Sequence, residues 1–402
     1  MTIPGLLPLR TGMQRYAWGS TTAIPELLGR EPDGEPVAEL WVGAHPVLPS
    51  TVEVEGEELP LDVFVERHAE VVLGAGIVDR FGRLPYLAKI LAAAQPLSLQ
   101  AHPSIAQATE GFDREHAAGI PLDAPNRCYR DRNHKPEIII ALTPFEALCG
   151  FRPVADSLEL LGRLAGPELT PWTTHLAERP DGHGLLDVVA GVLALDDARG
   201  AALAAEVRAG LDGLDGRWAA TGRLLVEIAE LHPTDPGIVV ACLLEYVTLE
   251  PGQALFLGAG NLHAYVRGVG VEVMASSDNV LRGGLTPKHV DPEELCRIVR
   301  PAVEPVPLIE PVAVAAGVHD YPVPVEDFSV RRITSDATLP VDGPVVLLVT
   351  GGSCSVAVDD GTIIELARGD AGLVLASAAR VECRGEATIW AVAASPAATA
   401  GT

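Results

Sequence analysis

The hydrophobic pattern of this chain changes twice, and these two changes restrict its fold more than any other feature. Up to about residue 150, short apolar runs alternate with Gly and Pro, as in AELWVGAHPVLPSTVEV, which is typical of strands and turns. Residues 155–232 carry apolar residues at three- and four-residue spacing, which predicts helices. From residue 237 the strand-like pattern returns. This order predicts a mainly β protein with a helical insertion.

The length of 402 residues favours two or three domains, because a single hydrophobic core seldom grows that large. The Pro-rich stretch PAVEPVPLIEP, from residue 301, predicts a linker, and short β-branched runs over 322–395 predict a second, smaller β-sandwich. Residues 61–75 have a helical pattern. We therefore expect a discontinuous first β domain (1–150 and 236–300), a helical insertion domain (151–235) and a C-terminal β domain (301–402).

Composition narrows the class of partner. Hydrophobic residues make up 48% and charged residues 21% of the chain, which is the balance of a globular protein. The formal net charge of -25, with no basic block, argues against binding to nucleic acid or to an anionic membrane. The six cysteines are scattered, no C-x-x-C occurs, and no apolar run approaches the ~18 residues of a membrane span. We expect a soluble, cytoplasmic protein with reduced thiols.

A metal site is predicted from three separate segments. In QPLSLQAHP, Gln100 and His102 have the two-residue spacing that places side chains on one face of a strand, and Lys135 and Glu137 repeat this spacing in NHKPE. His263 lies downstream, in GAGNLHAYVRG. Two imidazoles and a carboxylate are a ligand set of catalytic zinc, so spacing predicts His102, Glu137 and His263 as ligands. Gln100 offers only a neutral amide oxygen, and its chemistry alone predicts a hydrogen bond within the strand.

Cations near these motifs favour a small anionic substrate, with one group for a phosphate and another for developing negative charge. These are Lys89, Lys135, Arg282 and Lys288. The alternative for Lys288 is a surface lysine near a helix start. Asp278 and Glu272 are placed to orient Arg282 or to titrate. His45 precedes a proline in a turn, which favours a structural role over ligation.

Several common chemistries lose support because their motifs are absent from the sequence. No G-x-G-x-x-G follows a strand, and neither a G-x-x-x-x-G-K-[ST] loop nor a G-x-S-x-G elbow occurs. Metal-assisted proton transfer, metal-assisted hydrolysis, and oxygen chemistry at iron remain.

Five segments, in order along most of the chain, resemble type I mannose-6-phosphate isomerase, also called phosphomannose isomerase. They are YAWGS, AELWVGAHP, LSLQAHP, GFDREHAAGIPLDAPNRCYRDRNHKPE and GNLHAYVRGVGVEVMASSDNVLRGGLTPKHVD. The resemblance implies a cupin-type β-sandwich (jelly roll) catalytic domain, an inserted helical domain and a C-terminal β-sandwich domain. It also implies one Zn²⁺ per chain, held by Gln100, His102, Glu137 and His263, and a sugar phosphate as substrate.

The family's reaction is the interconversion of mannose 6-phosphate and fructose 6-phosphate, in which a proton moves between C2 and C1 through a cis-enediolate. The resemblance identifies Arg282 as the active-site arginine and aligns Ser98, Lys89, Lys135 and Lys288 with pocket positions. The base that moves the proton stays open. Its candidates are Lys135, Glu272, Asp278 and His134, although strand alternation would turn His134 away from Lys135 and Glu137.

Two other classes remain as alternatives. One is another metal-dependent cupin enzyme, such as an isomerase of a different sugar phosphate or an iron dioxygenase. The other is a non-catalytic cupin that binds a sugar phosphate, which should lack a full ligand set. The sequence does not indicate the oligomeric state, and a monomer is the default expectation.

Overall fold

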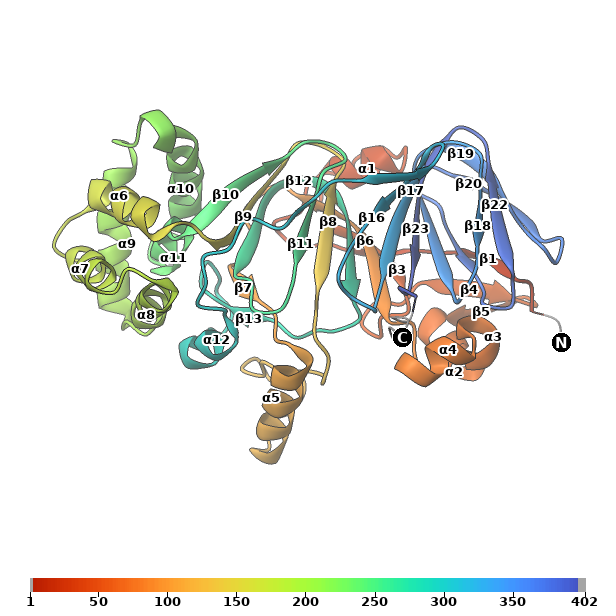
Figure 1. Cartoon of the computed structure of the whole chain (residues 1–402), viewed down its shortest axis with the longest axis horizontal. Helices are drawn as coiled ribbons and strands as arrows, with labels where there is room; N and C mark the ends of the chain where they lie inside the picture. The colour runs from red at the N-terminus through yellow and green to blue at the C-terminus, as the bar shows by residue number, and fades with distance from the viewer. Residues whose placement is uncertain (1–2, 397–402) are drawn as a thin grey trace, which may run out of the picture.

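The computed structural model describes residues 3–396, and its elements form three regions along the long axis of the molecule (Figure 1). A helical body lies at one end, an eleven-stranded sheet occupies the middle, and a ten-stranded sheet lies at the other end. The prediction of a mainly β protein with helices is confirmed.

The first sheet is organised around its longest strand, which changes partners along its length. Its strands are β2 (Gly12–Gln14), β3 (Glu39–Gly43), β6 (Tyr86–Ala93), β7 (Gln100–Ala101), β8 (Glu137–Ala141), β9 (Phe145–Phe151), β10 (Leu244–Leu249), β11 (Ala254–Leu257), β12 (His263–Ala275), β13 (Leu281–Arg282) and β14 (Leu308–Ile309). The first part of β12 pairs with β7 and β9, and the second part pairs with β6 and β8. Gly268 lies at this change with φ of 129°, and a Cβ there would approach Phe145 to 2.7 Å. A glycine therefore lets one strand serve both parts of the sheet.

Strand alternation gives the second part of this sheet one apolar face and one charged face. Ile90 of β6 lies opposite Val271 of β12, and both enter a buried apolar core. One position away, Lys89 lies opposite Glu272 on the other face. The period of two along each strand thus separates the residues that build the core from those that carry charge.

The second sheet contains the first strand of the chain, contrary to the expectation that residues 1–150 belong to the first β region. Its strands are β1 (Leu6–Leu9), β15 (Val312–Ala315), β16 (Val318–Tyr321), β17 (Ser329–Ile333), β18 (Ala337–Pro340), β19 (Val345–Val358), β20 (Ile363–Ala367), β21 (Ala371–Val374), β22 (Arg380–Arg384) and β23 (Ala387–Ala393). β1 runs antiparallel to β21, with Leu6 opposite Val374. The sequence identifies a strand here, but alternation carries no information about its distant partner. The expected linker also contributes β14, which pairs with β11.

The two sheets share one core. Leu40 and Ile90 of the first sheet belong to the same buried cluster as Val346 and Trp390 of the second. At this junction the buried hydroxyl of Tyr86 donates to the Pro344 carbonyl at 2.9 Å. The two sheets therefore pack directly against each other, in addition to being joined by the chain.

The helical body begins after β9 and ends before β10, two strands that pair with each other, with Phe151 opposite Leu244. Its elements are α6 (Val154–Leu164), α7 (Thr170–Glu178), α8 (Gly182–Leu193), α9 (Asp197–Leu211), η1 (Gly216–Trp218), α10 (Ala219–Leu231) and α11 (Gly237–Cys242). The carboxylates of Asp181 and Asp196 cap α8 and α9. The helical pattern over 155–232 is confirmed.

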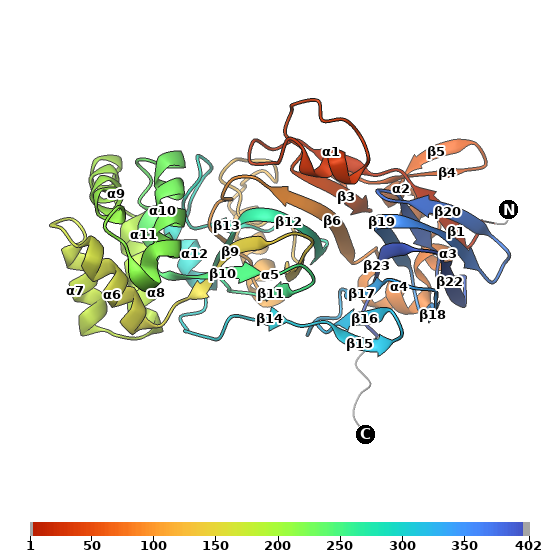
Figure 2. The same cartoon turned by 90° about the horizontal axis from the view of Figure 1, so that it is seen from above.

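The remaining helices lie outside the helical insertion. They are α1 (Ala23–Leu27), α2 (Leu61–Arg67), α3 (Ala69–Leu73), α4 (Ala75–Phe81), α5 (Ile105–Ala117) and α12 (Pro292–Ile298), and β4 (Thr51–Val54) and β5 (Glu57–Pro60) form a separate hairpin. Of these helices, α2, α3 and α4 lie beside the second sheet and α12 lies next to the helical body (Figure 2). The helix expected over 61–75 is present as α2, α3 and the start of α4. The sequence pattern did not predict α5, although Ser104 and Gln107 form a capping box at its start. Within residues 3–396, no helix combines the length and apolar character needed to cross a bilayer.

Candidate functional site

The three metal ligands predicted from spacing lie together in the first sheet. Glu137 begins β8, His263 begins β12, and His102 directly follows β7. Nε2 of His102 lies 3.5 Å from Oε1 of Glu137, and Nε2 of His263 lies 3.6 Å from Oε2 of the same carboxylate. All three side chains are buried, and their ligand atoms lie within 4.8 Å of one another. The fold thus gathers residues that are far apart in the sequence.

Each imidazole is oriented through its second nitrogen. Nδ1 of His102 donates to the carbonyl of Asn279 at 2.8 Å, and Nδ1 of His263 donates to the carbonyl of Asn261 at 3.1 Å. Because a carbonyl can only accept, the proton of a neutral ring lies on Nδ1 and the Nε2 lone pair is available, which is the tautomer that binds metals through Nε2. Burial also lowers the pKa of His102 to about 4, so its ring is neutral.

Three buried atoms in this group have no hydrogen-bond partner among the described residues: Nε2 of His102, Nε2 of His263 and Oε2 of Glu137. Buried polar atoms are nearly always paired, and an ionised carboxylate beside two lone pairs is unfavourable without a cation. The donor set and its unpaired atoms therefore fit a divalent metal ion of the zinc class.

Gln100 lies between two other site residues. On β7 it is opposite His263 of β12 on one side and opposite Arg282 of β13 on the other. Directly opposed residues of an antiparallel pair project to the same face. This register supports a place for the amide beside the metal ligands. Ser98, two residues earlier, precedes β7 and is half-buried.

Lys135 contacts the predicted glutamate ligand, as their spacing suggested. Its Nζ lies 2.8 Å from Oε1 of Glu137. Burial by itself raises the pKa of Glu137, but the positive charge of the Lys135 ammonium acts in the opposite direction, and that pKa is held well below its ordinary value. The carboxylate is therefore ionised.

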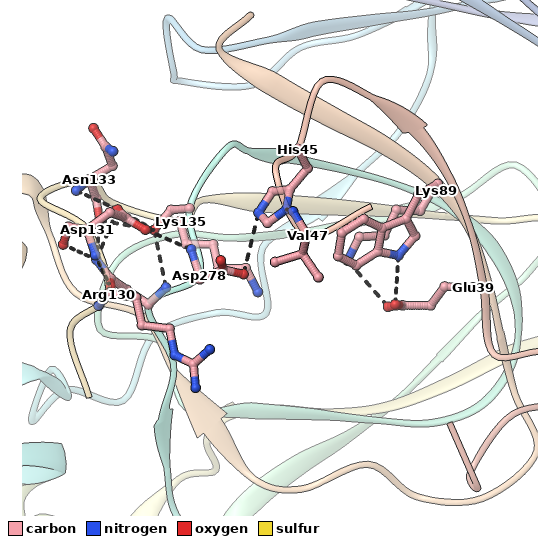
Figure 3. Close-up of polar contacts among 12 residues, drawn as sticks. Glu39, His45, Val47, Lys89, Arg130, Asp131, Asn133, Lys135 and Asp278 are labelled. Carbon is pink, nitrogen blue, oxygen red and sulfur yellow. Dashed lines mark hydrogen bonds and ion pairs between the residues drawn. The ribbon is translucent and has the colours of Figure 1, made fainter. Parts of the chain in front are cut away.

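Lys89 occupies the charged face of β6, between two carboxylates. Its Nζ lies 3.3 Å from Oε1 of Glu39 and 3.0 Å from Oε2 of Glu272. Figure 3 shows the contact with Glu39, which also accepts a 2.9 Å hydrogen bond from the Trp41 indole. Burial lowers the pKa of Lys89, but the charges of Glu272 and Glu39 raise it above the ordinary value. Lys89 is thus a buried cation with a fixed position.

The loop between β12 and β13 positions both a metal ligand and a carboxylate. Asp131 accepts hydrogen bonds from the Ser277 hydroxyl and from the backbone N–H of Asp278, both at 2.9 Å (Figure 3). The Asn279 side chain donates to the carbonyl of Asp131 at 2.8 Å. Since the backbone carbonyl of Asn279 accepts from His102, this network fixes that imidazole as well.

Asp278 itself faces His45, with 3.4 Å between Nε2 and Oδ1. Burial raises the pKa of Asp278, but the hydrogen bond and charge of His45 and the charge of Lys135 leave it lowered. His45 thus has a carboxylate as its partner.

Arg282 and Lys288 lie near a third cation, Arg130, which the sequence analysis missed. Burial and then the charge of Arg130 lower the pKa of Arg282, while burial, Arg282 and Arg130 lower the pKa of Lys288. None of these cations forms an ion pair with a carboxylate within residues 3–396. In Figure 3 the Arg130 guanidinium extends away from the contacts drawn around it. Its position in RCYRDRNHKPE, close before Lys135 and Glu137, was the available signal.

Tyr265 was also missed. It lies on β12 two residues after His263, is buried, and its pKa is raised well above the ordinary value by burial and by the charges of Glu272 and Glu137. The phenol therefore stays protonated beside those carboxylates. The i, i+2 spacing in HAY was its signal.

His134 does not join the group. Its Nε2 lies 2.8 Å from Oδ2 of Asp327, just before β17 of the second sheet. β8 begins only at Glu137, so strand alternation does not orient the His134 ring, and the Asp327 carboxylate holds it instead. The contact ties the segment before β8 to the segment before β17.

Comparison with known proteins places the chain in a family. A model of the phosphomannose isomerase type I catalytic domain matches residues 6–154. A mannose-6-phosphate isomerase of Escherichia coli is 43% identical over 325 residues, covering 80% of this chain and 82% of that protein. The chain belongs to the type I phosphomannose isomerase family. A human mannose-6-phosphate isomerase is 32% identical over 400 residues, covering 88% and 89% of the two chains.

Solved structures of phosphomannose isomerases superpose on nearly the whole chain. A variant of the Salmonella typhimurium phosphomannose isomerase matches with a TM-score of 0.91 and 36% identity, covering 97% of this chain and all of that one. A zinc-bound mannose 6-phosphate isomerase matches with a TM-score of 0.90 and 36% identity, over 98% and 100% of the chains. The resemblance found in the sequence motifs is confirmed.

Proposed function

We propose that this chain is a zinc-dependent mannose-6-phosphate isomerase that interconverts mannose 6-phosphate and fructose 6-phosphate by proton transfer through a cis-enediolate. The observation that carries the proposal is the buried group of His102, Glu137 and His263 with three unpaired ligand atoms. The names of its relatives supply the substrate.

The metal ligands in this proposal are Gln100, His102, Glu137 and His263. Zinc held there would supply positive charge to polarise a carbonyl and to offset negative charge that develops on oxygen. The chain's own contribution is orientation, since Asn279 and Asn261 hold both imidazoles through backbone carbonyls. The neutral amide of Gln100 leaves the centre more positive than a second carboxylate would.

Arg282, Lys288 and Arg130 are assigned to the anionic parts of the substrate. Burial is the main cause of the lowered pKa values of Arg282 and Lys288, and the charges of the neighbouring cations add to it. A phosphate dianion would relieve this repulsion between cations. Of these three cations, Arg282 is the one that the strand register places beside a proposed metal ligand, because it lies opposite Gln100. We assign Arg282 to the developing oxyanion and Lys288 with Arg130 to the phosphate.

Lys135 and Asp278 are the better candidates for the group that moves the proton. Glu272 is held by Lys89 within the sheet, and its side chain is only 4% exposed. His134 is bound to Asp327. The Asp278 side chain is 36% exposed and faces His45, which can relay a proton. Lys135 contacts the proposed metal ligand Glu137, which places it next to the metal site.

For the architecture we propose the division inferred from the sequence, with one change. Residues 1–150 and 236–300 form a cupin-type jelly-roll catalytic domain, 151–235 the helical insertion, and 301–402 a second β domain that also recruits β1. The pairing of β9 with β10 on either side of the helices supports the insertion.

The state of the cysteines indicates the kind of cellular compartment in which the protein works. All six are free in the structure. This supports the proposal that the protein works in a reducing compartment such as the cytoplasm.

The test is an assay of fructose 6-phosphate formation from mannose 6-phosphate with purified protein, before and after chelation and after zinc is returned. We expect activity to be lost on chelation and restored by zinc. Glucose 6-phosphate, the C2 epimer, is the control substrate. No turnover of mannose 6-phosphate with any divalent metal would overturn the assignment.

A further inference from the structure

A second group of metal-ligating side chains lies outside the site described above. The ligand atoms of Cys128, His289 and Asp291 all lie within 4.8 Å of one another. Thiolate, imidazole and carboxylate are the side-chain ligands that zinc uses in proteins. Around a tetrahedral ion with bonds of ~2.0–2.3 Å, ligand atoms lie about 3–4 Å apart, so small side-chain rotations would complete the geometry.

Two of these ligands are held in place by one hydrogen-bond network. The backbone N–H groups of Cys128 and Tyr129 both donate to the carboxylate of Glu115 at 2.9 Å. Asp291 caps α12 by accepting from the N–H of Glu294 at 2.9 Å through Oδ1. The Tyr129 hydroxyl donates to Glu294 at 2.6 Å, which ties the Cys128 loop to the start of α12. The sulfur and the carboxylate are therefore brought together before any ion binds.

His289 supplies the adaptable ligand. It is exposed, lies two residues before Asp291, and its ring has no hydrogen-bond partner among residues 3–396. Such an imidazole can rotate toward the other two groups at little cost. It also leaves the ion accessible to solvent, with room for water as a fourth ligand.

The local charge favours a cation over a free thiolate. Burial and then the carboxylates of Glu115, Asp291 and Glu294 raise the pKa of Cys128 to about 12, with Arg282 acting in the opposite direction. The same carboxylates attract a divalent ion. On binding, the sulfur forms a bond to the ion and its proton passes to solvent.

We propose that Cys128, His289 and Asp291 form a second binding site for a borderline-soft divalent cation such as Zn²⁺. The site is weaker than the His102–Glu137–His263 group, because it has an exposed ligand and must displace a thiol proton. An ion bound there would link the segment that carries Arg130 to the segment that carries Lys288. The proposal does not depend on the isomerase reaction.

The test is a titration of the zinc-loaded protein with Co²⁺, followed by absorption. A cobalt–thiolate bond gives a near-ultraviolet charge-transfer band, whereas the proposed ligands of the first site contain no sulfur and give none. We expect the band to grow with a second equivalent of metal in the unmodified protein and to be absent from Cys128→Ser. Cys296→Ser, which changes another half-buried thiol, is the matched control and should keep the band.

Two further variants keep the test decisive if Cys128→Ser fails to fold. His289→Ala removes an exposed ring, and Asp291→Asn retains an oxygen that can cap α12. Each variant should weaken the affinity for the second equivalent of metal by at least ~10–100-fold, which is the loss caused by removing a group that only supports a ligand. The first equivalent should stay bound. Absence of the band in the unmodified protein, its persistence in Cys128→Ser, or unchanged affinity in His289→Ala would overturn the proposal.

Discussion

The two sheets differ in what their buried faces contain. In the second sheet the buried side chains form an apolar cluster that includes Leu347, Val356 and Val381. In the first sheet the charged face of β6 and β12 buries Lys89 and Glu272, next to the metal-ligand group. A buried apolar cluster stabilises a sheet but offers no polar groups for binding a metal or a substrate. Buried charged and polar groups are stable only when each has a partner. The three unpaired ligand atoms lack one among the described residues, and a bound metal would supply it.

The largest effect is expected from breaking the metal-ligand group. His102→Ala and His263→Ala should lose bound zinc and lower kcat/KM on the order of 10³-fold, because several kcal/mol of charge stabilisation disappear with the metal. Metal content and turnover are measured together. His116→Ala, at an exposed position on α5, is the control and should change neither. An inactive variant that kept a full equivalent of zinc would remove that histidine from the ligand set.

Arg282→Lys tests whether the geometry of the cation matters as well as its charge. A compact ammonium cannot reproduce the planar guanidinium, so we expect kcat to fall roughly 10–100-fold while zinc stays bound. Arg300→Lys, an exposed arginine paired with Glu304, is the matched control. Normal turnover of Arg282→Lys would show that this residue is peripheral.

Lys89→Met tests the charged face of the first sheet. The substitution leaves Glu39 and Glu272 buried without their cation, and we expect the free energy of unfolding to fall by about 3–5 kcal/mol. Urea denaturation of the metal-free protein measures it. Adding Glu272→Gln to Lys89→Met should recover part of the loss, and a double variant no more stable than the single one would argue against an electrostatic cause.

Leu347→Ala is the corresponding change in the second sheet. Leu347 is fully buried in the apolar cluster, so its truncation should cost about 2–5 kcal/mol of stability. Turnover per folded molecule and zinc content should be unchanged. A fall in kcat measured well below the unfolding transition would show that the second sheet takes part in the reaction.

The smallest effect is a pH dependence at Asp278. Its folded-state pKa is lowered, so the stability that it contributes is present above the unfolded pKa of ~3.9 and is lost as pH falls through the folded pKa. The stability difference between the unmodified protein and Asp278→Asn, both metal-free, should therefore shrink between pH 5 and pH 3. A constant difference across this range would show that the carboxylate does not titrate with folding.

The sequence predicts the metal site better than its surroundings. Spacing of two residues predicts that Glu137 lies near Lys135. His102 and His263 are predicted as ligands with Glu137 because the residue type alone indicates whether a side chain can bind a metal. Gln100 enters the proposed ligand set only through the family resemblance, since its position depends on a strand register that no local pattern contains. Arg130 was missed because an exposed arginine in a loop gives no periodic signal.

For the fold, the pairing of strands that are distant in the sequence is what the sequence could not predict. Alternation identifies the strands and three- and four-residue spacing identifies the helices, but neither shows that β1 joins β21. The helix α5 was missed for a local reason, because polar residues dominate it and only its capping box marks its start.

The pairing of β1 with β21 also has a consequence for how the protein is made. Residues 6–9 leave the ribosome among the first of the described residues, whereas Ala371–Val374 are among the last. The early strand must therefore wait, unpaired, through almost the whole of synthesis, and an unpaired apolar strand is a site where nascent chains associate wrongly. Completion of the second sheet is therefore a late step of folding, because β21 is synthesised near the end of the described residues.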